Sequence, residues 1–428
     1  MSRPANHLLA RRAGIDTYQQ PVVYMRSDCP VCRAEGFQSQ AQVELVSGGR
    51  HLLAILHHVD REWLGRDEIA LSEVGWTLLG ACDGDPVVVR HPPLLESLAH
   101  LRAKVHGTRF GYEGLRPLMD DVSHGRVSDI HLASIVTVCA GGGLDMGETV
   151  ALTRAMVDVG ERIDWGVSPV VDKHCIGGLP GNRTPLIVVP IVAACGVTMP
   201  KTSSRAITSA AGTADAMETL APLNLDVAAM RRVVEREGGC IAWGGATRIS
   251  PADDMLIRVE RPLNIDSEGL LVASILSKKV AVGSQRVLID IPVGPLAKVR
   301  GVAAAGQLSQ SLVAVGAALG LLVVTAFTDG RQPVGRGIGP ALEAADVLAV
   351  LERRADAPAD LREPPKAAHR FSVEARHAGV VRGIDTRLVT RAAKLAGAPR
   401  DPAAGATLQV RVEDSQAPAF QIDIERQR

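Results

Sequence analysis

Apolar and polar residues alternate in short runs over the first part of the chain. Residues 21–25, 43–46 and 51–58 each have the strand-like composition and short length that are typical of β-strands. Gly48-Gly49 separates two of these runs, and the turn sequence Asp83-Gly84-Asp85-Pro86 closes the region. We therefore predict a small β-rich N-terminal domain that comprises residues 1–88.

The pattern becomes helical between residues 89 and 165. After Ser128, apolar residues recur at helical spacing until three glycines at 141–143 end the pattern, and the repeat resumes before Gly160. The apolar positions are Ile130, Leu132, Ile135, Val136 and Cys139, then Met146, Val150, Met156 and Val157. The pattern predicts a helical domain over residues 89–165, which is completed by about residues 255–283.

Beyond residue 166, buried strand-like runs alternate with helical ones. The runs are residues 169–171, 186–195, 287–291, 301–319 and 321–327. This alternation predicts an α/β domain over residues 166–354, with a mixed, largely parallel sheet that binds its ligand at the carboxyl ends of the strands. Residues 355–368 have the composition of a linker, and a small α+β C-terminal domain is expected over residues 369–428.

The composition narrows the range of functions. Lys+Arg and Asp+Glu each number 47, so the formal net charge is zero and nothing favours binding to nucleic acid or to a membrane. Aromatic residues make up only 3%, which argues against platforms for base stacking. The seven cysteines are odd in number, and no apolar stretch is long enough for a membrane span. We expect a cytoplasmic enzyme that acts on a small anionic or neutral substrate.

Two short motifs carry less weight. Cys29-Pro30-Val31-Cys32 has no second cysteine pair or histidine at metal-ligand spacing, so no metal site is expected, and a redox pair is the weaker interpretation. The chain has no phosphate-binding P-loop sequence. The turn region from Asp329 to Pro340 is interpreted as structural.

The segment from Asp172 to Thr184 has the features of an anion site. Lys173 and His174 precede a glycine-rich turn, and the apolar run from Pro185 onward can present a helix N-terminus to the same point. A second block, residues 201–213, gathers hydroxyl groups around Lys201 and Arg205, as a phosphate site requires. A turn with a Ser/Thr-rich helix cap is the alternative for that block. The presence of both segments favours phosphate.

A third motif lies on a predicted helix at residues 270–279. Ser274 and Lys278 are four residues apart and share one helix face. Together they could hold a carbonyl and a ring N–H of a flat heterocycle, with Arg258 or Arg261 reaching in from the preceding segment. A solvated lysine on an amphipathic helix is the alternative, which the apolar neighbours make weaker.

These three motifs resemble the signatures of the thymidine and pyrimidine-nucleoside phosphorylases. The resemblance covers about residues 94–350, and Thr213 follows Ser203 at the matching distance of ten residues. The N-terminal domain and the sequence Gly-Leu-Pro-Gly-Asn resemble a longer branch that holds archaeal AMP phosphorylases and bacterial putative thymidine phosphorylases. The resemblance implies a helical domain and a phosphate-binding α/β domain that close over a cleft, in a homodimer or a larger assembly.

The same resemblance implies a pentosyltransferase that carries out the reversible phosphorolysis of a nucleoside, as a thymidine phosphorylase does. Inorganic phosphate is the co-substrate, and no cofactor or metal is expected. The residues expected to bind phosphate are Lys173, Cys175, Gly177, Gly178, Thr184, Ser203, Ser204 and Thr213. The residues expected to bind the base are Arg258, Arg261, Ser274 and Lys278. His174 and Lys278 are expected to be catalytic, with His174 as the proton donor near neutral pH.

Three features depart from the shorter members of that family. The glycine-rich loop is one residue longer, and Pro185 stands where they have a phosphate-binding serine, so Thr184 is expected to take its place. Cys175 replaces a serine and is a weaker hydrogen-bond donor. The tail after about Leu361 is shorter than the C-terminal domain of the family.

Three alternatives stay open from the sequence. A nucleoside 5′-monophosphate phosphorylase would release ribose 1,5-bisphosphate, and a non-catalytic metabolite-binding protein could use the same scaffold. Anthranilate phosphoribosyltransferase is related by fold but needs an acidic magnesium-pyrophosphate motif, for which Asp253-Asp254 alone is thin support.

Overall fold

The structure is a computed structural model of the chain. It describes residues 7–17, 20–60, 63–181, 183–206, 211–247, 249–265, 267–295, 297–331, 333–352 and 369–374, and the short segments 390–391, 393–394, 398–400, 405–408 and 421–426. The chain forms two compact units, residues 1–99 with 124–131, and residues 100–123 with 132–428. The expected linker at 355–368 lies outside the described residues. Within the described part, no helix is both long enough and apolar enough to cross a membrane.

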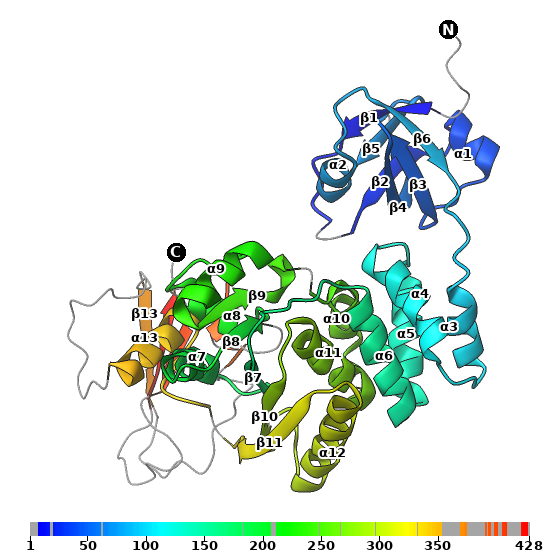
Figure 1. Ribbon diagram of the computed structural model, residues 1–428. Coiled ribbons are helices and arrows are strands. Elements are labelled where there is room, and N and C mark those ends of the chain that lie inside the picture. Colours follow the sequence, from blue (N-terminus) through cyan, green and yellow to red (C-terminus); the bar gives the residue numbers. More distant parts are fainter. Residues whose placement is uncertain are drawn as a thin grey trace. The chain divides into compact units, whose positions relative to one another are not determined.

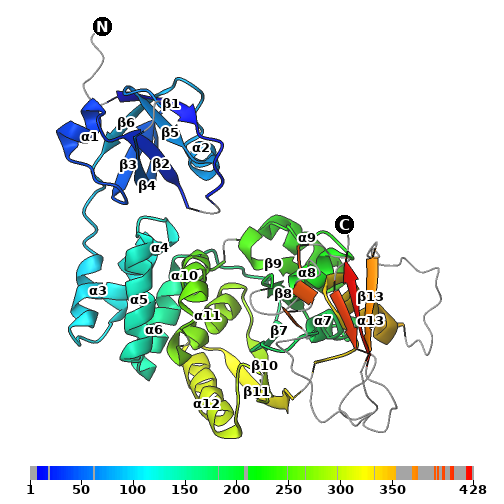
Figure 2. The ribbon, with the colours of Figure 1, turned by 180° about the vertical axis from the view of Figure 1, so that it is seen from behind.

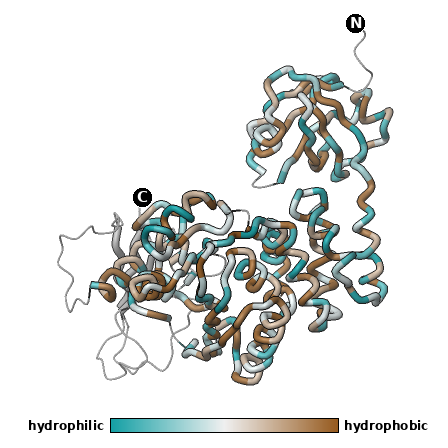
Figure 3. Tube along the Cα trace, in the orientation of Figure 1, coloured by the Kyte–Doolittle hydropathy of each residue, from teal (hydrophilic) through white to brown (hydrophobic). Residues whose placement is uncertain are grey.

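The first unit contains a closed six-stranded barrel with the strand order β1-β5-β2-β4-β3-β6 (Figure 1). The strands are β1 His7–Arg12, β2 Val22–Arg26, β3 Gln42–Ser47, β4 Arg50–Val59, β5 Glu68–Leu71 and β6 Pro86–Arg90. Helices α1 Pro30–Glu35 and α2 Glu73–Leu79 lie on opposite sides of the barrel. The strands expected from the sequence are β2, β3 and β4. Hydrophobic residues are frequent in the barrel (Figure 3), and buried and partly buried residues alternate strictly along β3.

Cys29 and Cys32 belong to the barrel core. Both are free and buried, and Cys29 caps α1 because its Sγ accepts a hydrogen bond of 3.1 Å from the Cys32 N–H. The pKa of the Cys29 thiol is lowered to about 7, mainly by its hydrogen bond with Cys32. The described residues contain no group of three histidine, cysteine or acidic side chains that could hold a metal ion.

The helical part of the second unit begins with four helices in sequence. They are α3 Leu98–Val105, α4 Tyr112–Ser123, α5 Asp129–Gly141 and α6 Met146–Asp158. Helices α10 Pro251–Leu263, α11 Glu268–Ala281 and α12 Val302–Ala318 come from later in the chain, and α11 packs against both α6 and α12 (Figure 2). Helices α5 and α6 follow the predicted pattern with two exceptions. Ile130, in the first turn of α5, is 73% exposed, and Met146, the first residue of α6, is 45% exposed.

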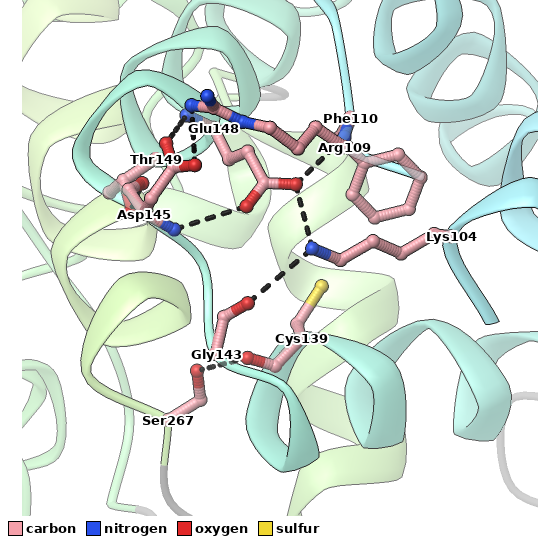
Figure 4. Close-up of polar contacts among 9 residues, drawn as sticks. All are labelled: Lys104, Arg109, Phe110, Cys139, Gly143, Asp145, Glu148, Thr149 and Ser267. Carbon is pink, nitrogen blue, oxygen red and sulfur yellow. Dashed lines mark hydrogen bonds and ion pairs between the residues drawn. The ribbon is translucent and has the colours of Figure 1, made fainter. Parts of the chain in front are cut away.

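A buried ion pair fixes the turn between α5 and α6 (Figure 4). The Lys104 ammonium lies 2.7 Å from the Glu148 carboxylate, which also accepts hydrogen bonds from the backbone N–H groups of Phe110 and Asp145. Asp145 caps α6 in return, since its side chain accepts from the Glu148 N–H. Burial opposes the charge of Glu148, but these partners outweigh it and lower the pKa of its carboxyl.

The α/β part of the second unit has a parallel three-stranded sheet with the order β11-β10-β7. Its strands are β7 Val171–Cys175, β10 Arg286–Val293 and β11 Leu322–Asp329. Helix α12 covers one face, where Val287, Ile289 and Ile291 of β10 pack against Leu308 and Leu312. A second parallel pair, β8 Met199–Ser203 with β9 Gly239–Trp243, is connected to the β7 side by a bridge between Val170 and Thr198.

The remaining elements flank these strands. They are α7 Thr184–Ala194, α8 Thr213–Glu218, α9 Val227–Glu237, η1 Gly244–Ala246 and α13 Pro340–Leu351. A four-stranded antiparallel sheet joins β12 Gly337–Ile338 to β13 His369–Glu374, β14 Gly405–Leu408 and β15 Gln421–Arg426. The run at residues 379–381, which the sequence placed in the C-terminal domain, lies outside the described residues.

One local prediction was wrong. Residues 172–175 were expected in a loop after a strand at 169–171, but they form β7 itself. Polar side chains are tolerated there because β7 pairs with β10 along its whole length and ion pairs neutralise its charged residues. The turn begins only at Gly177, whose φ of +87° requires a glycine-like backbone.

Candidate functional site

The candidate site is built around β7, at the carboxyl end of the parallel sheet. Successive side chains of a strand point to opposite faces, so Lys173 and Cys175 lie on one face and Asp172 and His174 on the other. The contacts agree with this alternation. The Lys173 ammonium contacts the Thr184 hydroxyl at 2.5 Å and the Asp290 carboxylate at 3.1 Å, whereas Asp172 contacts α11.

Lys173 and Thr184 were both predicted from the sequence to bind phosphate, and the structure brings them together. Thr184 is the first residue of α7, so its hydroxyl and the helix N-terminus face the Lys173 ammonium. Asp290 on β10 balances the charge of Lys173 and also accepts a 2.5 Å hydrogen bond from the Thr328 hydroxyl.

The glycine-rich loop between β7 and α7 needs its glycines for two reasons. Gly177, Gly178 and Gly181 all have φ between +72° and +87°. In addition, a Cβ on Gly178 would lie 2.7 Å from the Lys298 backbone nitrogen, and one on Gly181 would lie 2.1 Å from the Val334 carbonyl oxygen. The loop therefore passes too close to neighbouring backbone for any side chain at these two positions.

Arg183 fixes the end of this loop, a role that the sequence did not reveal. Its buried guanidinium donates to the carbonyl oxygens of Val334 and Gly337, at 2.5 and 3.1 Å, and lies 3.0 Å from the Asp346 carboxylate. The turn region at 329–340, which was interpreted as structural, thus holds the loop in place. A bidentate arginine with two carbonyl acceptors is well suited to such a clamp.

Behind His174 lies a cluster of buried charges from three elements. The Asp172 carboxylate of β7 lies 2.6 Å from the Lys279 ammonium of α11 and 3.9 Å from the Lys201 ammonium of β8. Lys279 is 2% exposed and Lys201 4% exposed. Burial is the main factor that lowers the pKa of Lys201, to about 7, with repulsion from Lys279 added and attraction by Asp172 opposing it.

His174 is held neutral in this environment, and its expected role as a proton donor stays a prediction. Burial, followed by repulsion from Lys279, Lys201, Lys278 and Lys173, holds the pKa of His174 well below its usual range. A neutral imidazole can still donate one N–H hydrogen bond.

The base-binding pair expected on α11 is present as a structural unit. The Lys278 ammonium lies 3.5 Å from the Ser274 hydroxyl and 2.5 Å from the buried Asp253 carboxylate of α10. Burial opposes the charge of Lys278, but attraction by Asp253 and its acidic neighbours prevails and raises the pKa. Both candidate arginines lie on α10: Arg258 is partly buried, and Arg261 is exposed in the last turn.

The second phosphate block is only partly arranged as expected. Ser203 ends β8 and Thr213 begins α8, both partly buried, while Ser204 is exposed. Arg205 was expected to supply charge for phosphate, but its guanidinium contacts the Glu218 carboxylate at 2.8 Å and Asp215 at 3.4 Å. Its charge is already compensated.

Cys175 lies on the Lys173 face of β7. Its Sγ accepts a 3.4 Å hydrogen bond from the Gly177 N–H. Burial, with the nearby Asp290, raises the pKa of the thiol to about 11, so Cys175 stays protonated at pH 7.

The sequence predictions omitted Asp172, Lys279, Asp290 and Asp253 as site residues, and they named Lys201 only as a charge for phosphate. The available signal was the presence of charged residues inside apolar strands and helices, where each needs a partner. The partners come from positions 25 to 117 residues apart, so spacing could not identify them.

Comparison with known proteins identifies the family of this chain. Models of a glycosyl transferase family match the helical bundle domain at residues 99–160 and the a/b domain at residues 167–361. A protein of Acidovorax sp. (strain JS42) named "Putative thymidine phosphorylase 2" is 56% identical over 459 residues, covering 96% of this chain and 90% of that protein. The chain belongs to the thymidine phosphorylase family.

Further members of the thymidine phosphorylase family are similarly close. "Putative thymidine phosphorylase 1" of the same strain is 55% identical over 95% of this chain and 89% of its own length. The protein named "Putative thymidine phosphorylase" of Polaromonas sp. (strain JS666 / ATCC BAA-500) is also 55% identical, over 94% of this chain and 89% of its own. The aligned regions are longer than this chain, so these relatives carry residues that it lacks.

Among solved structures, anthranilate phosphoribosyltransferase from Thermus thermophilus matches with a TM-score of 0.48 and 17% identity, over 60% of this chain and 84% of that chain. The glycosyl transferase family has a helical bundle domain and an a/b domain, and this chain matches both. It is a glycosyltransferase of that family.

Proposed function

We propose that this protein is a thymidine phosphorylase, a pentosyltransferase that cleaves a pyrimidine (deoxy)nucleoside with inorganic phosphate. The products are the free base and (deoxy)ribose 1-phosphate. The observation that carries the proposal is the contact of Lys173 with Thr184 beside the glycine-rich loop, together with the Ser274–Lys278 pair on α11. The names of the relatives support the same reaction.

Phosphate is proposed to bind on the Lys173 side. Lys173 supplies charge, the Thr184 hydroxyl and the N-terminus of α7 supply donors, and the loop at Gly177 and Gly178 lets backbone N–H groups turn inward. Ser203 and Thr213 are proposed to donate from the second block. Cys175, with its protonated thiol, is a weak donor at most.

The base is proposed to bind on the Lys278 side. Ser274 and Lys278 would contact a ring carbonyl and ring nitrogen, and Asp253 holds Lys278 charged and oriented. An arginine of α10, Arg258 or Arg261, is proposed to join them.

In the proposed reaction a phosphate oxygen attacks the anomeric carbon and inverts it, while the bond to the base nitrogen breaks and its electron pair leaves with the base. The ring carries positive charge in the transition state, so placing the phosphate dianion below the sugar supplies much of the catalysis. Lys278 and the His174 N–H stabilise the negative charge of the departing base. A phosphate dianion beside Lys173 would also offset the lysine charges and raise the pKa of His174.

The test is phosphate-dependent release of free base from thymidine, uridine, cytidine, AMP and CMP. We expect release from thymidine, lost in Lys278→Met and kept in Arg236→Gln, a charge-removing control on the exposed surface of α9. Release from the monophosphates alone would show a nucleoside-monophosphate phosphorylase. No release from any compound would favour a metabolite-binding protein.

A further inference from the structure

Lys201 differs from its neighbours in how its charge is compensated. It lies within β8, with its ammonium hydrogen-bonded to the carbonyl oxygen of Thr202. Among the described residues, the carboxylate oxygen paired with it belongs to Asp172, at 3.9 Å, which is beyond hydrogen-bonding distance. Asp172 already holds Lys279 at 2.6 Å.

The other two buried lysines each have a carboxylate in direct contact. Lys279 has Asp172, and Lys173 has Asp290 at 3.1 Å. Three ammonium groups therefore share two carboxylates in a region closed to water, and Lys201 is the least compensated of the three. A buried ammonium without its own counter-charge is expected to lose its proton.

Lys201 is also close to the proposed phosphate site. Ser203 follows it by two residues on β8, so the two side chains leave the strand on the same face. Lys173 acts on the pKa of Lys201, which is lowered to about 7 by burial, then by Lys279. An anion held by Lys173 and Ser203 would therefore supply the negative charge that Lys201 lacks.

We propose that Lys201 is a positioning residue that takes up a proton when a tetrahedral dianion binds beside Lys173, so that anion binding is coupled to protonation of Lys201. The proton comes from the buffer and adds to the neutral amine, and no covalent bond changes. This inference rests on the phosphate site of the proposed function. It adds that the affinity of this site for the anion depends on pH.

The surroundings contain few other groups that could take the proton. On β7, Asp172 lies 3.9 Å from Lys201 and His174 shares its face, while Lys173 lies on the opposite face. Lys278 and Lys279 act on the same cluster from α11. On β9, burial raises the pKa of the Cys240 thiol to about 12, so it stays neutral. Helix α7 has no titratable side chain, and α9 packs with Met230 and Val234, while its Arg232, Glu235, Arg236 and Glu237 are exposed. His174 is the main competitor.

The experiment is a calorimetric titration of the full chain with sodium sulfate at pH 8, in two buffers of different ionisation enthalpy. Sulfate is a tetrahedral dianion that does not titrate near neutral pH, so any proton taken up goes to the protein. We expect uptake of about one proton per sulfate, and an affinity that falls about tenfold per pH unit from pH 8 to 9. Lys201→Met should abolish the uptake and make the affinity independent of pH, while His174→Gln should keep both.

Calorimetric unfolding of Lys201→Met checks that the variant folds. A methionine of similar length in place of a poorly compensated buried lysine is expected to be tolerated. Uptake that persists in Lys201→Met but disappears in His174→Gln would overturn the inference in favour of His174. Binding without proton uptake, or no sulfate binding at all, would overturn it too. Proton-coupled sulfate binding by a chain that releases no base would leave the inference standing and remove only the proposed reaction.

Discussion

Asp172 is the only carboxylate in contact with Lys279 in the described part of the chain, and replacing it tests the charge cluster directly. In Asp172→Asn the ammonium of Lys279 keeps a polar neighbour but loses its counter-charge. If it stays charged, breaking the buried pair costs about 3–5 kcal/mol. If the Lys279 ammonium instead loses its proton, deprotonation costs about 1.4 kcal/mol for each pH unit below the ordinary lysine pKa of about 10.4. This free energy is about 4.6 kcal/mol at pH 7 and about 1.9 kcal/mol at pH 9.

Both routes give a loss of about 3–5 kcal/mol at pH 7, and the second makes the loss shrink as the pH rises. The sign follows from linkage: the unfolded chain keeps the proton up to about pH 10.4, so the folded variant, which lacks it, gains stability as the pH increases towards that value. The midpoint of thermal unfolding should therefore fall by roughly 6–20 °C at pH 7. If Lys279 becomes neutral in the variant, the drop at pH 9 should be less than half as large.

Scanning calorimetry at pH 7, 8 and 9 measures these shifts. Asp226→Asn is the matched control, because Asp226 caps the exposed helix α9 and asparagine caps equally well. A drop of the same size at pH 7 and pH 9 would show that the Lys279 ammonium stays charged in the variant. A drop no larger than that of the control would refute the argument that Asp172 compensates buried lysine charge.

Three further predictions concern catalysis, the helical domain and the loop. His174→Ala should lower the turnover of phosphorolysis by about 100-fold or more with little change in sulfate affinity, since it acts at the base; unchanged turnover would exclude that role. Lys104→Met should cost about 3 kcal/mol at pH 7 and less at pH 5, where Glu148 can be protonated; calorimetry that shows the same loss in a Glu148→Gln background would contradict this. Gly181→Ala should weaken sulfate binding more than Gly177→Ala, because both have positive φ but only a Cβ at 181 meets backbone, at 2.1 Å; equal effects in titration would exclude the steric cause.

The sequence predicted the parts of the fold that depend on local pattern. Helices α5 and α6 and strands β2 to β4 follow from periodicity and from capping or turn residues, which are local properties. The parallel sheet followed from the alternation of strands and helices. The strand β7 did not, because Asp172-Lys173-His174 is too polar to be interpreted as a buried strand without knowledge of its partners on β10 and α11.

Some features of the candidate site could also be predicted from the sequence, and others could not. Lys173 with Thr184 and Ser274 with Lys278 were each predicted as neighbours, and each pair is in contact. The neutral state of His174 could not be predicted, since it arises from burial and then from lysines on three different elements. Arg183 was also missed, because its acceptors are carbonyl groups more than 150 residues away, which carry no sequence signal.

The alternation of side chains along β7 has a consequence for how this protein can change in evolution. Because Lys173 and His174 are adjacent but on opposite faces, a substitution that alters one face leaves the contacts of the other largely unchanged. An insertion or deletion of one residue within the strand is different. It would exchange the two faces, turning Lys173 away from Asp290 and Asp172 away from Lys279 in a single step. Point substitutions can therefore adjust the two halves of the site separately, whereas a change in the length of β7 would disrupt both.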